Sequence, residues 1–271
     1  DNPHTKPAAF WEWVIGEVQS EYPEVIFLSE AFTRPRVLEN LAKIGFTQSY
    51  TYFTWRETKT EFTEYLTELT QSETTEYLRP NFFPNTHDIL PHVLQFAGRP
   101  AFMMRLVLAA TLSSTYGIYS GYELCENTPR GERGTTVYYQ DSEVYEYKVR
   151  NWNRVGNIKE YVAKINAIRR ENPALQELTN LRFHGADNEN VLFYSKVLEG
   201  NAVLVAVNLD PYNTHAAHLE LPLEDLGLSE DDEYVLEELI SNREIPGRGH
   251  RFWVQIQSDS PAEIFRVKKR N

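Results

Sequence analysis

The sequence of 271 residues contains little sulfur, with one cysteine (Cys125) and two methionines. A single cysteine cannot form a disulfide within the chain, and no metal-ligand spacing surrounds it, so disulfide-stapled folds and cysteine–zinc sites are excluded. The scarcity of cysteine fits a reducing, cytoplasmic location. A buried structural thiol is the simplest interpretation of Cys125, because no neighbouring motif would activate it as a nucleophile.

Positive charge is also scarce, because 27 Lys and Arg residues stand against 39 Asp and Glu residues and the formal net charge is −12. An acidic protein repels phosphate backbones and anionic lipids, so we expect neither nucleic acid nor a membrane as a partner. No apolar run approaches the ~18 residues of a membrane span, and we expect no signal peptide.

Apolar residues are plentiful at 41%, and aromatic residues reach 13%. This is enough material for a sizeable core, and it excludes a disordered chain. Aromatic rings stack on the apolar faces of sugars, so the composition suits a carbohydrate protein. A large aromatic core explains the same composition better, and composition alone therefore decides nothing about function.

The first ~150 residues alternate short apolar runs with helical patterns, as parallel βα units do. Strands are predicted at 25–29, 46–53, 79–84 and 115–120. Helices are predicted at 7–20, 35–44, 59–70, 89–97, 100–113 and 158–171. The run 25–29 (VIFLS) is continuously apolar, as expected for a strand that is buried on both faces.

After about residue 178 the pattern changes to strands without helices. Strands are predicted at 181–184, 190–197, 202–208, 215–221, 233–240, 251–257 and 262–267. Short strands separated by turn-forming residues are typical of an antiparallel β-sandwich. We therefore predict two domains, an α/β domain at 1–177 and an all-β sandwich domain at 178–271.

Acidic residues follow two of the predicted parallel strands, at Glu30 and Asp88. Catalytic groups of parallel βα folds lie at the carboxyl ends of strands. Glycosyl transfer needs two carboxyl groups, one to donate a proton to the leaving oxygen and one to attack or stabilise the anomeric carbon. Glu30 could equally cap the helix that begins near Pro35, and position alone favours Asp88 as the N-cap of a helix at Ile89. Asp1 would complete a trio, although position alone favours a disordered terminal residue.

Three stretches resemble, in order, signature regions of the α-amylase superfamily, glycoside hydrolase family 13. They are DNPHTKP (1–7), FLSEAFTRP (27–35) and FFPNTHDIL (82–90). Their wording is most similar to the α-1,4-glucan:maltose-1-phosphate maltosyltransferases, which extend bacterial α-glucans. The resemblance implies that 1–177 is the second half of a (β/α)8 barrel and that 178–271 is the carboxyl-terminal β-sandwich of that family.

The resemblance implies catalytic roles for three carboxylates. Asp1 aligns with the nucleophile, which forms a β-glycosyl-enzyme. Glu30 aligns with the acid/base, which protonates the departing phosphate oxygen and later deprotonates the 4-hydroxyl of the acceptor. Asp88 aligns with the third carboxylate, which grips sugar hydroxyls and stabilises the transition state.

The resemblance also implies three substrate-binding residues. Asn2 aligns with a neutral donor to the phosphate. His87 matches the sugar-contacting histidine of general amylases, where many maltosyltransferases have proline. Tyr145 resembles a donor-sugar contact, although Val144 stands where lysine is expected.

The implied substrates are maltose 1-phosphate and α-1,4-glucan. Two displacements at one carbon retain the α configuration, with the carboxyl pair ~5–5.5 Å apart. No metal or other cofactor is expected, because phosphate leaves with a proton. Two alternatives stay open: an α-amylase-type hydrolase or glucanotransferase acting on α-1,4-glucan, and a noncatalytic glucan-binding module.

The chain begins at the candidate nucleophile, so its four parallel strands would be the fifth to the eighth of the barrel. Half a barrel has open edges. We therefore expect a piece of a longer protein that is inactive alone, with an amino-terminal companion fragment completing the barrel or a half-sheet left exposed. The family resemblance suggests that the parent protein is a homodimer.

Overall fold

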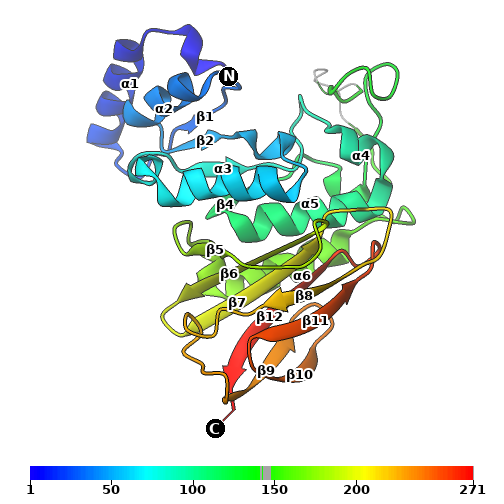
Figure 1. The fold of residues 1–271 in the computed structure, drawn as a ribbon. Helices are drawn as coiled ribbons and strands as arrows, with labels where there is room; N and C mark the ends of the chain where they lie inside the picture. Colours follow the sequence, from blue (N-terminus) through cyan, green and yellow to red (C-terminus); the bar gives the residue numbers. More distant parts are fainter. Residues whose placement is uncertain (141, 143–147, 271) are drawn as a thin grey trace.

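The computed structural model describes residues 1–140, 142 and 148–270. A parallel α/β region comes first in the chain, and antiparallel sheets follow (Figure 1). Within the described residues, no helix is both long and apolar enough to cross a membrane.

The first region contains a four-stranded sheet in the order β1-β2-β3-β4, with every neighbouring pair parallel. Its strands are β1 (Leu28–Ser29), β2 (Gln48–Tyr50), β3 (Pro80–Phe82) and β4 (Thr115–Tyr116). They confirm the four predicted strands but are shorter than predicted. Parallel strands place their carboxyl ends at one edge of the sheet, and this edge carries the candidate catalytic residues.

Six α-helices accompany these strands in the described part of the chain. They are α1 (Ala8–Glu21), α2 (Pro35–Lys43), α3 (Lys59–Gln71), α4 (His92–Phe96), α5 (Gly98–Leu112) and α6 (Lys159–Glu171). Short 3-10 helices lie at Pro3–Thr5, Tyr52–Trp55, Glu73–Glu76, Tyr122–Leu124 and Pro173–Gln176. The helix predicted from residue 89 begins only at His92, because Pro91 disfavours helical backbone in the residue before it. Residues Thr58 and Glu61 form a capping box at the start of α3.

The antiparallel region contains a six-stranded sheet in the order β10-β9-β12-β7-β6-β5 and a separate pair, β11-β8. Its strands are β5 (Leu181–Phe183), β6 (Val191–Leu198), β7 (Asn201–Asn208), β8 (His215–Glu220), β9 (Glu233–Glu238), β10 (Arg243–Arg248), β11 (Arg251–Ile256) and β12 (Ala262–Lys269). Strand β10 was not predicted, because it contains Pro246 and Gly247. It lies at an edge of the sheet, where proline is tolerated better than in a central strand.

The central strands β6 and β7 of the six-stranded sheet are buried on both faces. One face carries Leu192, Tyr194 and Val205, which belong to the same hydrophobic cluster as the side chains of α5. The opposite face carries Phe193 and Ala206, which pack with residues of β8 and β11. The helix α5 thus joins the parallel region to the antiparallel sheets through one continuous core.

Candidate active site

Two acidic candidates and a histidine converge at the carboxyl edge of the parallel sheet. Glu30 follows β1, and His87 and Asp88 lie in the loop after β3. The His87 Nε2 atom lies 3.0 Å from Asp88 Oδ2 and 3.8 Å from Glu30 Oε1. One potential ligand atom from each residue lies within 4.8 Å of the others. All three side chains are partly buried, so they are shielded from solvent in part and stay accessible in part.

One oxygen of Glu30 is poised for a partner that the described residues do not supply. Glu30 Oε1 is buried, and it has no hydrogen-bond partner among them. A buried carboxylate oxygen without a partner is costly, and a catalytic role is one of the recognised explanations for it. This geometry favours a chemical role for Glu30.

The capping alternatives for the two acids are wrong. Arg34 is the N-cap of α2, which has no side-chain cap, so Glu30 does not cap that helix. Pro91 is the N-cap of α4, and Asp88 does not cap it either. The backbone N–H of Asp88 donates to Thr86 Oγ1 at 3.1 Å, and the Asp88 carboxylate lies 3.0 Å from His87 Nε2.

The start of the chain lies beside Glu30. The backbone N–H of Asn2 donates to the carbonyl oxygen of Glu30 at 2.9 Å. The Asn2 side-chain amide donates to Asp1 Oδ1 at 2.7 Å. Trp11 Nε1 holds the same segment by donating to the carbonyl oxygen of Pro3 at 2.8 Å. The structure therefore brings Asp1 and Asn2 to the edge that carries Glu30, while Asp1 stays exposed.

The loop after β3 is anchored by a buried amide. The Asn85 side chain donates to the Tyr139 hydroxyl at 2.8 Å and accepts the backbone N–H of Tyr119 at 3.0 Å. The Tyr119 ring centroid lies 6.3 Å from that of His87. These contacts fix the backbone immediately before His87 and Asp88.

An aromatic cluster beside the carboxylates was missed by sequence reasoning. Phe32 lies between Tyr50 and Trp55, with ring centroids 5.7 Å and 5.0 Å away, and Tyr50 lies 4.8 Å from Phe83. The Trp55 side chain is 40% exposed, so it offers an open ring face next to the site. In the sequence, these aromatic residues could be noticed only because they stand near the ends of strands. Which way each side chain points depends on the strand register, which the sequence does not reveal.

Tyr50 lies close enough to Glu30 and Asp88 for their negative charges to affect its pKa. Burial raises the pKa of Tyr50 to about 12, and the negative charges of Glu30 and Asp88 add to the effect. Tyr50 therefore keeps its hydroxyl proton at neutral pH and presents a hydrogen-bond donor near the carboxylates.

The three groups Glu30, His87 and Asp88 are also donors that a divalent metal could use. Exposed acidic groups are common without a metal, and the reaction that the resemblance implies needs none. The predicted donor-sugar contact Tyr145 lies outside the described residues.

The model of a family described as "GLGE, C-terminal" matches residues 183–267. The α-1,4-glucan:maltose-1-phosphate maltosyltransferase of Rhodospirillum rubrum is 54% identical over 273 residues, which cover 98% of this chain and 39% of that protein. A second enzyme of this name, from Streptomyces coelicolor, is 51% identical over 99% of this chain and 40% of its own length. The chain is a homologue of these maltosyltransferases.

This maltosyltransferase homologue spans about 40% of the length of the curated relatives that it matches. Its fold resembles the α-amylase of Geobacillus thermoleovorans solved with acarbose, with a TM-score of 0.73 and 15% identity over 98% of this chain and 58% of that one. An α-amylase from Lactobacillus plantarum gives a TM-score of 0.67 at 14% identity, over 98% of this chain and 61% of that one. The expected fold, part of an amylase barrel followed by antiparallel sheets, is confirmed.

Proposed function

We propose that the protein containing this chain transfers maltosyl units from maltose 1-phosphate to the non-reducing end of α-1,4-glucan and releases phosphate. The observation that carries the proposal is the convergence of Glu30, His87 and Asp88 at the strand ends of a maltosyltransferase homologue. The Asn2–Glu30 hydrogen bond supports it, because it holds the candidate nucleophile segment at the same edge.

The proposed reaction has two displacements. In the first, the Asp1 carboxylate attacks the anomeric carbon of maltose 1-phosphate while Glu30 gives its proton to the departing phosphate oxygen. A β-maltosyl-enzyme ester results. In the second, ionised Glu30 takes the proton of the acceptor's 4-hydroxyl, whose oxygen displaces Asp1 from the anomeric carbon. Two inversions restore the α configuration.

The neighbouring residues have supporting roles in this scheme. Asp88 holds sugar hydroxyls and stabilises the positive charge that develops on the ring. His87 is a second sugar contact, and its proximity to both carboxylates is consistent with that role. Asn2 faces the phosphate, and Tyr145 stays a predicted donor-sugar contact.

Several properties of the parent protein stay predictions. They are a domain boundary at 177/178, a homodimer, an amino-terminal companion fragment that completes the barrel, and a cytoplasmic location. The scheme uses no metal or cofactor, because proton donation by Glu30 activates the leaving group.

A second candidate function is hydrolysis or transglycosylation of α-1,4-glucan without phosphate. One observation favours it: His87, which resembles the sugar-contacting histidine of general amylases, lies 3.0 Å from Asp88. Dependence on phosphate separates the two functions. A noncatalytic glucan-binding module is disfavoured by the paired carboxylates and the unpartnered Glu30 oxygen.

The test is phosphate release from maltose 1-phosphate by the full-length protein, with and without a maltooligosaccharide acceptor. Glu30→Gln removes the proton that the leaving group needs, so the rate should fall by about 10²–10⁴-fold. Glu24→Gln changes an exposed glutamate a few residues earlier and should leave the rate unchanged. A full rate in the Glu30 variant would falsify the acid/base assignment. Glucan cleavage without any phosphate dependence would favour the second candidate.

A further inference from the structure

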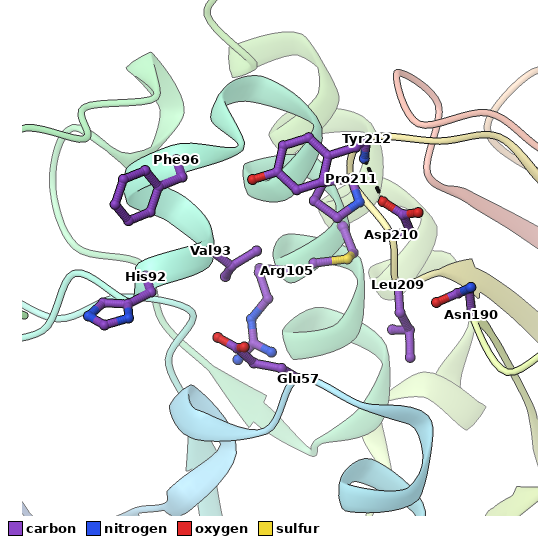
Figure 2. Close-up of a pocket in the computed structure, with 11 residues that line it drawn as sticks. Glu57, His92, Val93, Phe96, Arg105, Asn190, Leu209, Asp210, Pro211 and Tyr212 are labelled. Carbon is purple, nitrogen blue, oxygen red and sulfur yellow. Dashed lines mark hydrogen bonds between the residues drawn. The ribbon is translucent and has the colours of Figure 1, made fainter. Parts of the chain in front are cut away.

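A pocket lies where the parallel region meets the antiparallel sheets (Figure 2). It has a volume of about 440 Å³, within the range of about 300–1,000 Å³ that is usual for small-molecule sites. Glu57 contributes from the loop after β2, His92 and Phe96 contribute from α4, and Tyr212 contributes from the turn after β7. The catalytic proposal does not use this pocket.

The pocket shares its loops with the candidate active site. Trp55, whose ring lies against Phe32 beside Glu30, is two residues before Glu57, so the two Cα atoms are at most about 7 Å apart. His92 follows Asp88 by four positions along the next loop. The segments that line the pocket are thus continuous along the chain with those beside the candidate catalytic residues.

The buried guanidinium of Arg105 holds the loop after β2, the one that carries Trp55 and Glu57. Arg105 donates to the carbonyl oxygens of Arg56 at 2.6 Å and Phe53 at 2.8 Å, and it lies over the Phe53 ring at 4.3 Å. Burial lowers the pKa of Arg105 to about 10, so the group is still a cation at neutral pH. Its two terminal nitrogens donate to the loop and its Nε atom is buried without a partner, while the negative charge of Glu57 lies nearby and offsets the cation. The pocket is therefore poorly suited to an anion.

A rigid turn presents an aromatic ring at the opposite wall. The Asp210 carboxylate accepts the backbone N–H groups of Tyr212 at 2.8 Å and Asn213 at 3.3 Å, and it meets His215 Nε2 at 2.9 Å. Burial opposes ionisation of Asp210, but these hydrogen bonds outweigh it and lower the pKa to about 2. The Tyr212 side chain is nevertheless 63% exposed, so the turn is held while its ring stays open.

The remaining lining favours a neutral, polyhydroxylated ligand. Phe96 is 55% exposed across from Tyr212, and Figure 2 shows the two rings above Arg105 and Glu57 in this view. The side chains of Glu57, His92 and Asn190 line the same hollow and make no hydrogen bond within the described residues. Open rings suit the apolar faces of sugars, and the polar groups suit their hydroxyls.

We propose that this pocket binds a short stretch of α-1,4-glucan from the acceptor chain, remote from the end that reacts. The identity of the ligand rests on the proposed function. Tyr212 and Phe96 stack on glucosyl rings, and Glu57, His92 and Asn190 bond to their hydroxyls. Such a site favours long acceptors over short ones, because only a long chain reaches it from the carboxylates.

The test compares long amylose with maltotetraose as acceptors for the full-length protein carrying Tyr212→Ala or Phe96→Ala. The ratio of kcat/KM for the long acceptor to that for the short one should fall about tenfold in each variant. Tyr212→Phe keeps the ring and should restore most of the ratio. Trp253→Ala removes a ring of similar exposure outside the pocket and should not change the ratio.

Affinity electrophoresis in amylose gels measures glucan binding by the pocket directly. The measurement uses proteins that also carry Glu30→Gln, so that no turnover occurs. Retardation should be weakened by Tyr212→Ala and kept by Tyr212→Phe. An unchanged acceptor ratio together with unchanged retardation in both alanine variants overturns the pocket proposal. If phosphate release from maltose 1-phosphate is absent while retardation still depends on Tyr212, the proposed function fails and the pocket stands.

Discussion

The backbone N–H of Asn2 donates a hydrogen bond of 2.9 Å to the carbonyl oxygen of Glu30. This bond joins the segment before α1 to the end of β1, and the Asn2 side chain donates in turn to Asp1. Asn2 has a φ of 46°, in the left-handed region that asparagine tolerates better than most residues. One residue thus sets the position of the candidate nucleophile relative to the candidate acid/base.

The substitution Asn2→Gly separates the two contributions of this residue. Glycine keeps the left-handed backbone and its N–H, but it removes the amide that donates to Asp1. A hydrogen bond to a charged group contributes about 1.5–3 kcal/mol, so kcat/KM for maltose 1-phosphate should fall roughly 10–100-fold. Initial rates of phosphate release by the full-length protein measure this. A rate within twofold of the parent would show that the amide neither positions Asp1 nor binds the phosphate.

Gly117 controls the position of an aromatic ring in the site. A Cβ atom at this position would lie 2.3 Å from Cζ of Phe83, whose ring is 4.8 Å from Tyr50. Gly117→Ala should therefore displace Phe83, lower the free energy of unfolding by about 1–3 kcal/mol and reduce transfer. Chemical denaturation and phosphate release measure the two effects.

The matched control for this substitution is Gly16→Ala. Gly16 lies within α1, and an added Cβ would meet nothing within 4 Å. Alanine should raise the free energy of unfolding by about 0.5–1 kcal/mol and leave transfer unchanged, because it only reduces the freedom of the unfolded chain. Equal destabilisation by both substitutions would argue against a specific clash with Phe83.

The convergence of Glu30 and Asp88 could be predicted, because both follow parallel strands whose carboxyl ends share an edge. The choice between capping and catalysis could not, since it depends on where the helices begin. Proline at position 91 delays α4 to His92 and removes the capping role of Asp88. Tyr50 could not be predicted either, because a strand of three residues does not reveal which face each side chain takes.

In the antiparallel region, too, some strands could be predicted from the sequence and one could not. Runs such as that of β6 were recognised because branched and aromatic residues fill both buried faces. Strand β10 was missed because Pro246 and Gly247 are rare in central strands. Gly247 is required there by the fold, since a Cβ atom would lie 2.2 Å from the Tyr234 ring. That approach comes from a neighbouring strand and leaves no local pattern.

Lys196 predicts a pH dependence of stability. It is buried on β6, where its ammonium group donates to the carbonyl oxygen of Glu177. Burial, with a smaller contribution from Arg169, lowers its pKa from 10.5 to about 7. Between pH 7 and 10.5 the unfolded chain binds more protons at this position than the folded chain. The contribution of Lys196 to the free energy of unfolding therefore rises with pH across that window and is least favourable below pH 7.

Lys196→Met should abolish this dependence. The substitution should raise the free energy of unfolding more at pH 6 than at pH 9.5. At pH 9.5 the loss of the hydrogen bond to Glu177 should reduce or reverse this gain. Denaturant unfolding at the two pH values measures the difference. Equal changes at both values would mean that the buried amine does not titrate in this range.

Tyr50→Phe tests whether the hydroxyl near the two acids takes part in transfer. Because the pKa of Tyr50 is about 12, the group is a protonated donor throughout the range from pH 6 to 9. Its removal should lower kcat/KM for transfer by about 3–10-fold, the cost of one ordinary hydrogen bond, without changing the shape of the pH–rate profile in that range. Tyr22→Phe, an exposed tyrosine, is the control and should have no effect. A profile that gains or loses a limb in the Tyr50 variant would mean that Tyr50 titrates with the reaction, and a full rate would mean that its ring alone serves the site.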